Sequence, residues 1–202
     1  MKLYFSPGAC SLSPHIALLE AGIVAQYEQV DTKTKAMKSG GDFRSISPKG
    51  AVPTLELDDG QILTEGPAIV QYIADRRPET KLAPPAGSMA RYRLQEWLNY
   101  ISSEVHKPLS LMFSATATDP SRQTQRDLVA PKFDFLDTAL DGKPFLLGEQ
   151  FTVADGYLFN MLCWTIPTAI DLGRWPAVRD YNGRIASRPA VRAALKAEGL
   201  IP

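Results

Sequence analysis

Cys10 is the side chain in this 202-residue sequence whose type and position best suit chemistry. It lies between a β-prone run at residues 2–5 and a helical apolar pattern that includes Pro14, so we expect it near the start of a helix. Unpaired amides and the helix dipole favour the thiolate there, and the thiolate is the reactive form of cysteine. Position alone leaves a small, buried and unreactive thiol equally open. The second cysteine, Cys163, lies in an apolar segment, which predicts an unreactive thiol.

The cysteine count limits the chemistry further. With two cysteines and no Cys-x-x-Cys pair, the sequence has neither a disulfide framework nor the ligands of a zinc cluster, and no metal site is expected. Thiol chemistry at Cys10 would require a sulfur from another molecule, such as a small thiol. The two histidines are His15, expected to be structural, and His106, which could titrate near neutral pH.

Charge and hydropathy exclude several partners. The 22 basic and 22 acidic side chains give a formal net charge of zero, without the basic field of a nucleic-acid-binding protein. The sequence has no run of about 18 apolar residues that would span a membrane. A Pro-Gly break falls within the first eight residues, and no uninterrupted apolar segment follows that could serve as a secretory signal. We therefore expect a cytoplasmic protein with neither nucleic acid nor membrane as a partner.

Strand and helix signals alternate in the first part of the chain. The order is strand, helix, strand, loop or helix, strand, strand, helix, which suits one small α/β domain. Gly22 is expected to end the first helix. A segment rich in Pro, Gly and charge at residues 77–87 indicates an interdomain linker. The strands are expected at residues 2–5, 27–30, 52–57 and 61–63, and the helices at residues 12–19 and 67–74.

The chain after the linker has only helical signals. Apolar residues recur at helical spacing from Leu94 to Val105 and from Val129 to Leu140. Pro131 is expected to kink the second of these helices or to mark its start. These patterns predict an all-helical domain after the α/β domain. Further helix starts are expected at the capping box of Thr152 and Asp155 and at Pro176 and Pro189.

Four segments resemble the bacterial beta-class glutathione S-transferases. They are residues 1–18, 50–55, 63–70 and 147–155, and the resemblance is collinear from Met1 to Pro202. It implies a thioredoxin-like α/β domain of order βαβαββα over residues 1–80, which binds glutathione. It also implies an all-helical domain over residues 87–202, with a pocket for an electrophile, and assembly as a homodimer.

The first domain holds several glutathione-binding positions that the resemblance implies. Val52 matches a valine whose backbone pairs with the cysteinyl part of glutathione, and Pro53 matches a cis-proline, although X-Pro bonds are usually trans. Glu65 and Gly66 match the site of the γ-glutamyl group, whose ammonium suits a carboxylate and whose carboxylate suits a helix N-terminus. Lys35, within a lysine cluster, matches a lysine near the glycyl carboxylate.

The helical domain supplies the remaining positions. Helical spacing places Asn99, Ser103 and His106 on one face, which is ordinarily a solvated face. The resemblance instead assigns this face to glutathione, partly across the dimer interface. It places His106 near the reactive sulfur as a catalytic group that could stabilise the thiolate or relay a proton. Trp164 and Phe113 are expected in the second-substrate pocket, with an ordinary core role open for Trp164. The glutathione-binding residues implied here are Asn99, Ser103, Glu104, Val105, His106 and Lys107.

The implied activity is that of a cysteine-type glutathione transferase with Cys10 and His106 as catalytic residues. Glutathione would be the co-substrate, no other cofactor is expected, and the second substrate would be a hydrophobic electrophile. Because Cys10 can form a mixed disulfide with glutathione, thiol–disulfide exchange, peroxidase or dehalogenation chemistry would accompany modest conjugation. Tyr4 and Ser11 are nearby hydroxyls of the kind that other transferase classes use, with Ser11 the better placed.

Two other functions stay open at the level of sequence. A glutaredoxin-like thiol reductase would share the chemistry of Cys10, but it would reduce disulfides readily and barely conjugate electrophiles. A non-catalytic binding or regulatory protein on the transferase fold would be indicated by failure to bind glutathione. The neutral charge and the presence of Cys10, Glu65 and His106 count against this second alternative.

Overall fold

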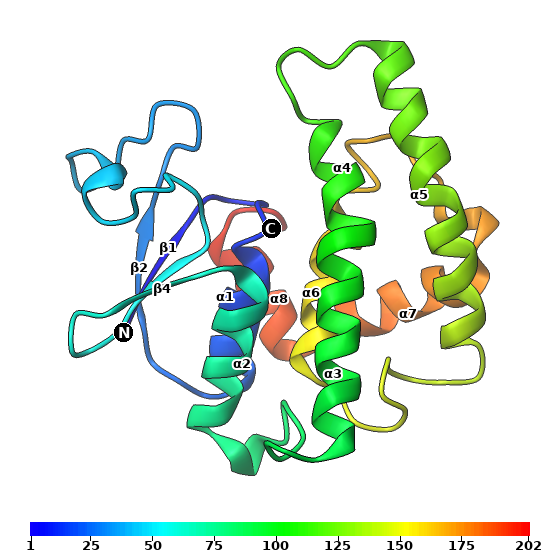
Figure 1. The fold of residues 1–202 in the computed structure, drawn as a ribbon, viewed down its shortest axis with the longest axis horizontal. Helices are drawn as coiled ribbons and strands as arrows, with labels where there is room; N and C mark the ends of the chain where they lie inside the picture. Colours follow the sequence, from blue (N-terminus) through cyan, green and yellow to red (C-terminus); the bar gives the residue numbers. More distant parts are fainter. The chain divides into compact units, whose positions relative to one another are not determined.

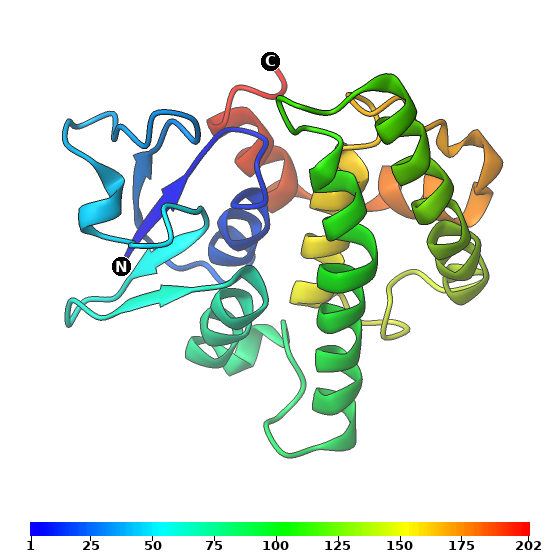
Figure 2. The same cartoon turned by 45° about the horizontal axis from the view of Figure 1, so that its top comes forward.

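The computed structural model describes residues 1–202, which divide into two units (Figure 1, Figure 2). The first unit comprises Met1–Ala83 together with Arg188–Pro202, and the second unit comprises Pro84–Ser187. The change of unit falls within the expected linker. The C-terminal residues belong to the first unit, although the sequence pattern placed all of residues 87–202 in one helical domain.

A four-stranded sheet lies in the first unit, in the order β2-β1-β3-β4. β2 runs parallel to β1, whereas β3 runs antiparallel to both β1 and β4. Leu3 of β1 lies opposite Leu55 of β3, and both side chains are fully buried. The four strands lie where the sequence predicts them, although β3 begins two residues later than expected, at Thr54. Their bounds are β1 Lys2–Phe5, β2 Gln26–Gln29, β3 Thr54–Glu56 and β4 Ile62–Thr64.

Three helices accompany this sheet: α1 (Leu12–Glu20), α2 (Gly66–Arg76) and α8 (Pro189–Ala197). α1 begins after Ser11 and ends before Gly22, which has a left-handed φ of 62°, as predicted. Both α2 and α8 pack against α1, which is why the C-terminal residues join this unit (Figure 2).

The second helix of the expected βαβαββα order is reduced to a 3-10 turn at Phe43–Ser45. The Phe43 ring is fully buried and lies 5.3 Å from the Tyr4 ring. This one aromatic contact anchors the long connection between β2 and β3 to the sheet. The thioredoxin-like order is therefore confirmed, with its middle helix shortened.

The second unit is all-helical, as predicted. A π-helical segment, Ile101–His106, joins α3 to α4, so the expected helix contains wider turns where His106 lies. Both expected apolar faces are buried, apart from the half-buried Trp97. No helix of the structure combines the length and apolarity needed to cross a membrane. The helix bounds are α3 Met89–Tyr100, α4 Lys107–Leu111, α5 Asp119–Leu140, α6 Val153–Cys163 and α7 Pro176–Ala186.

Helix α5 is longer than the apolar pattern predicts. It begins at Asp119 and contains Pro131 on its exposed side, so the alternative that Pro131 marks the helix start is wrong. Thr118 and Ser121 set the start instead, because the N–H of each donates to the side-chain oxygen of the other, at 2.8 Å from Thr118 and 3.3 Å from Ser121.

A buried carboxylate organises the start of α6. Asp155 accepts hydrogen bonds from the N–H groups of Leu146 at 2.8 Å and Thr152 at 2.7 Å, and from Oη of Tyr181 at 3.0 Å. Burial raises the pKa of Asp155, and these hydrogen bonds oppose that rise. The predicted capping box of Thr152 and Asp155 is confirmed, and it extends to the preceding loop and to α7.

Replacing Asp155 by alanine should destabilise the protein more than the loss of an ordinary helix cap. Several buried donors would lose their acceptor, so we expect the free energy of unfolding to fall by about 3 kcal/mol, against about 1 kcal/mol for Thr118→Ala at the exposed cap of α5. Urea denaturation followed by circular dichroism measures both losses. Equal losses would show that the buried network adds nothing to the cap.

Candidate active site

A tight turn joins β1 to α1 and leads directly to Cys10. The N–H of Ala9 donates to the carbonyl of Ser6 at 3.0 Å. Gly8, at the third position, has a φ of 70°, which glycine adopts without strain. Oγ of Ser11 accepts from the N–H of Ser6 at 3.1 Å and donates to its carbonyl at 3.2 Å. These bonds fix the backbone from which Cys10 projects.

Cys10 is half-buried, and its Sγ donates to the carbonyl oxygen of Val52 at 3.2 Å. Burial raises the pKa of the Cys10 thiol to about 11; a backbone hydrogen bond opposes this and the charge of Glu65 adds to it. The backbone favours the thiolate as expected, but burial has the larger effect on the pKa, so the alternative of a buried thiol fits the free protein better. Helix α1 starts only at Leu12, two residues after Cys10. At neutral pH Cys10 is a thiol.

The two nearby hydroxyls both serve the fold. Oη of Tyr4 donates to Glu56 at 2.7 Å, and burial together with this hydrogen bond raises the pKa of Tyr4. Ser11 is fully buried and closes the turn through Ser6. Cys10 is therefore a better candidate for the reactive group than either hydroxyl.

Residues far apart in the sequence meet around Cys10. The Val52-Pro53 peptide bond is cis, as the resemblance implied. A Cβ placed on Gly66 would lie 3.8 Å from Cγ of Pro53, so the N-terminus of α2 lies beside that proline. Glu65 is the N-cap of α2 and has a left-handed φ of 70°. The first unit thus groups the thiol with the start of α2 and the segment before β3.

The Glu65 carboxylate already holds an ammonium group of this chain. Nζ of Lys49 donates to Glu65 at 2.6 Å and to Oγ1 of Thr64 at 3.0 Å. Both charged side chains are exposed, and such pairs contribute only about 0–1 kcal/mol. A ligand ammonium could therefore take the place of Lys49.

Lys35 lies in the connection between β2 and β3. Its Nζ donates to the carbonyl of Thr32, and its Cδ and Cε would lie 3.6 Å from a Cβ placed on Gly50. Lys33 and Lys38 line an open hollow of about 710 Å³, which Lys35 does not line. Of these three lysines, Lys35 is the one that contacts the segment leading to Val52.

An aromatic group, His106, Tyr157, Trp164 and Phe113, lies in the second unit. Nδ1 of His106 is 2.7 Å from Oη of Tyr157, and its ring is 5.1 Å from that of Trp164, edge to face. The Phe113 ring is also 5.1 Å from that of Trp164. Burial lowers the pKa of His106 to about 4, and the charge of the exposed Lys107 adds to the effect. His106 is therefore neutral at pH 7.

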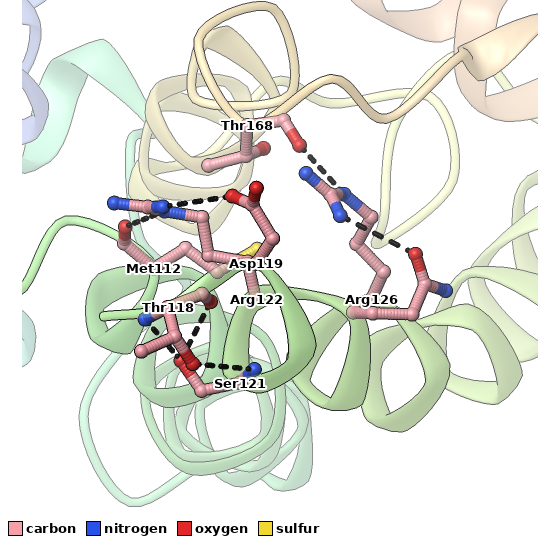
Figure 3. Close-up of polar contacts among 8 residues, drawn as sticks. Met112, Thr118, Asp119, Ser121, Arg122, Arg126 and Thr168 are labelled. Carbon is pink, nitrogen blue, oxygen red and sulfur yellow. Dashed lines mark hydrogen bonds and ion pairs between the residues drawn. The ribbon is translucent and has the colours of Figure 1, made fainter.

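Two arginines of α5 hold the segments that flank this aromatic group (Figure 3). Nε of Arg122 donates to the carbonyl of Met112 at 3.2 Å, one residue before Phe113. Nε of Arg126 donates to the carbonyl of Thr168 at 3.0 Å, in the segment after α6. Each flanking segment is thus tied to the same helix.

The remaining predicted residues of the α3–α4 region lie in different environments. Asn99 and Ser103 are exposed, and Oγ of Ser103 donates to the Asn99 carbonyl at 3.0 Å. Glu104 pairs with Lys132 of α5 at 2.6 Å, and this hydrogen bond and charge lower the pKa of Glu104. The Val105 side chain is fully buried in the core, so only its backbone could meet a ligand.

The structure thus groups predicted site residues around Cys10 in the first unit and around His106 in the second unit, whereas Asn99, Ser103 and Glu104 have other partners. Nowhere do three His, Cys, Asp or Glu side chains gather as a metal site would require. Sequence reasoning assigned no site role to Lys49 or Tyr157. Their partners lie 16 and 51 residues away along the chain, so no local motif marks either residue.

His106 should remain neutral in the folded protein between about pH 8 and pH 5. We expect its imidazole C–H resonances to stay constant over this range and to move only toward pH 4, because burial disfavours the cation. An NMR titration measures this, with His106→Gln used to assign the signals.

The same shift has a consequence for stability. The unfolded chain takes up a proton at about pH 6.5, so the contribution of neutral His106 to stability is lost as the pH falls from there toward its folded pKa of about 4. A titration midpoint near pH 6.5 in the folded protein would contradict both expectations.

Comparison with known proteins identifies the family of the chain. The N-terminal domain of the glutathione S-transferase family matches residues 8–76, and the C-terminal domain of that family matches residues 119–196. The glutathione S-transferase GstA of Escherichia coli O157:H7 is 41% identical over 200 residues, which cover 99% of this chain and 100% of that protein.

Solved structures extend the similarity to the whole chain. A beta-class glutathione S-transferase of Sphingomonas chungbukensis is 46% identical with a TM-score of 0.96, and a sphingomonad glutathione S-transferase complexed with glutathione is 46% identical with a TM-score of 0.95. Both comparisons cover 100% of each chain. The chain belongs to the glutathione S-transferase family, is closely similar to its bacterial beta-class members, and is a glutathione transferase.

Proposed function

We propose that this transferase works through Cys10 and binds glutathione at the residues grouped around it. The supporting observation is the 3.2 Å hydrogen bond from Sγ of Cys10 to the Val52 carbonyl. In the family that the sequence resembles, the backbone at this valine pairs with the cysteinyl part of glutathione. The sulfur of glutathione would then lie close to Cys10. The sphingomonad relative was solved with glutathione, which supports the same ligand here.

Groups complementary to both ends of glutathione lie in the first unit. Glu65 would pair with the γ-glutamyl ammonium in place of Lys49, and the N–H of Gly66 at the start of α2 would bind the neighbouring carboxylate. Lys35 would approach the glycyl carboxylate. The three ligand charges would thus each meet a group of opposite charge or a helix terminus.

Cys10 would exchange disulfides with glutathionylated thiols in two steps. Its thiolate, formed by loss of the proton to solvent, attacks the glutathione sulfur of RS–SG, so that RS⁻ leaves and a mixed disulfide forms on Cys10. A second glutathione thiolate then attacks the bound glutathione sulfur and releases the Cys10 thiolate and oxidised glutathione. Peroxidase or dehalogenating chemistry would pass through the same mixed disulfide.

The two free cysteines suit a reducing cytoplasm, where we place the protein.

The aromatic group of the second unit would bind a hydrophobic electrophile. Phe113 is 49% exposed and Trp164 is half-buried, so the two rings offer apolar surface to a ligand. His106 adds a hydrogen-bonding nitrogen without a charge, because burial holds its pKa at about 4. This chemistry suits an uncharged aromatic or halogenated substrate.

We also propose that the protein is a homodimer. Trp97, Tyr100 and Phe135 form an aromatic cluster between α3 and α5, in which Phe135 is 51% exposed. Exposed aromatic side chains are enriched at protein interfaces. Asn99 and Glu104 lie on the same stretch of helix, and the resemblance assigns them to glutathione, partly across the dimer interface.

The Cys10→Ala protein should still be retained on immobilised glutathione but should lose exchange with glutathionylated substrates. The charged contacts that bind glutathione do not use the thiol, whereas the mixed disulfide requires it. Intact-mass spectrometry after treatment with oxidised glutathione should show one adduct in the wild type and in Cys163→Ala, and none in Cys10→Ala. Unchanged exchange in Cys10→Ala would remove Cys10 from the mechanism.

Replacing Trp164 by alanine should weaken binding of the electrophile while leaving glutathione binding intact. We expect KM for chlorodinitrobenzene to rise about tenfold, since losing an aromatic contact costs roughly 1–2 kcal/mol. KM for glutathione should change by less than about twofold. Trp164→Phe keeps a ring at this position and serves as the control. Equal effects on both KM values would place Trp164 in the core and not in the pocket.

A further inference from the structure

The C-terminal segment carries a buried carboxylate that the proposed chemistry does not use. Glu198 directly follows α8, and its side chain has 0% exposure. One carboxylate oxygen accepts from Nδ1 of His15 at 2.9 Å, and the other accepts from the N–H of Gly8 at 2.9 Å. Glu198 therefore joins the end of the chain both to α1 and to the turn that precedes Cys10.

The environment of His15 holds this carboxylate in place. The buried His15 ring packs 4.4 Å from the Tyr27 ring of β2 and 6.1 Å from the Phe5 ring of β1. A buried carboxylate is strongly disfavoured unless both of its oxygens have hydrogen-bond partners. The hydrogen bond from His15, whose ring packs against the sheet, therefore holds Glu198 next to α1.

Gly8 is the residue through which Glu198 acts on the turn. It occupies the left-handed position of the turn, and a Cβ placed there would lie 3.4 Å from Cδ2 of Leu200. The C-terminal segment thus meets the turn through a hydrogen bond, and Leu200 lies beside Gly8 where a side chain would be. Any displacement of Gly8 would move the backbone from which Cys10 projects, two residues later.

We propose that Glu198 is a positioning residue for Cys10, because its contact with Gly8 fixes the turn that holds the sulfur against the Val52 carbonyl. The proposal rests on the function proposed above for Cys10. Glu198 contributes no chemistry of its own. It determines where the sulfur lies when glutathione arrives.

A second carboxylate provides a matched control. Glu20, in the last turn of α1, accepts from Arg188 at 2.6 Å and 2.9 Å. It therefore also connects α1 to the C-terminal segment, but its hydrogen bonds go to Arg188 and not to the turn. Glu20→Ala should report the stability effect of losing such a connection without the effect on Cys10.

The test compares Glu198→Ala, Glu198→Gln and Glu20→Ala in a Cys163→Ala background, where Cys10 is the one remaining thiol. In Glu198→Ala we expect iodoacetamide to alkylate Cys10 about tenfold faster, because the sulfur leaves the Val52 carbonyl, and kcat/KM for exchange to fall about tenfold. Glu198→Gln should recover most of both values, since its amide oxygen still accepts from Gly8. Glu20→Ala should lower stability and leave both values within about twofold.

Two results would overturn the proposal. One is a Glu198→Ala protein whose alkylation rate and kcat/KM equal those of Glu20→Ala, which would leave Glu198 a purely structural role. The other needs no variant: rapid hydrogen exchange at the Gly8 amide of the wild type, while the α1 amides are protected. Alkylation does not depend on turnover, so this test stays valid even if Cys10→Ala retains exchange, a result that would overturn the proposed function instead.

Discussion

The contact between Sγ of Cys10 and the Val52 carbonyl depends on how the segments of the first unit are arranged. It requires the β1–α1 turn on one side and the segment before β3 on the other. These two segments meet because β1 and β3 pair antiparallel, with Leu3 opposite Leu55. The sheet register therefore determines where the thiol lies, and the hydrogen bonds of the turn hold it there.

Burial decides the charge of both candidate catalytic groups in the free protein. It raises the pKa of Cys10 to about 11 and lowers that of His106 to about 4, so each is uncharged at pH 7. A carbonyl can accept from a thiol but not from a thiolate, so the Val52 contact also favours the protonated sulfur. A ligand that pairs with the Val52 backbone would compete for that carbonyl and would remove this preference. Activation of Cys10 would then be coupled to glutathione binding.

Sequence signals at the ends of helices predicted those helices correctly. The features that could not be predicted depend on contacts between residues far apart in the sequence. Gly22 ends α1, and Thr152 with Asp155 starts α6, because caps act within one turn. The alternative that Pro131 marks the start of a helix was wrong because the packing of the α5 apolar face tolerates a proline on the exposed side. The glutathione-binding positions and the cis-proline were predicted from the resemblance to the beta-class glutathione S-transferases and not from local sequence signals. Sequence could not predict the burial of Cys10, the pairing of Tyr157 with His106, or the return of α8 onto α1, since each depends on tertiary packing.

The pH dependence of Cys10 alkylation in the Cys163→Ala protein tests the protonation of the sulfur most directly. The rate constant with iodoacetamide can be followed by mass spectrometry from about pH 7 to pH 10. With a pKa of about 11, the rate should rise about tenfold for each pH unit across this range without reaching a plateau. A plateau below about pH 8 would mean that Cys10 is already a thiolate in the free protein and that burial does not hold the sulfur protonated.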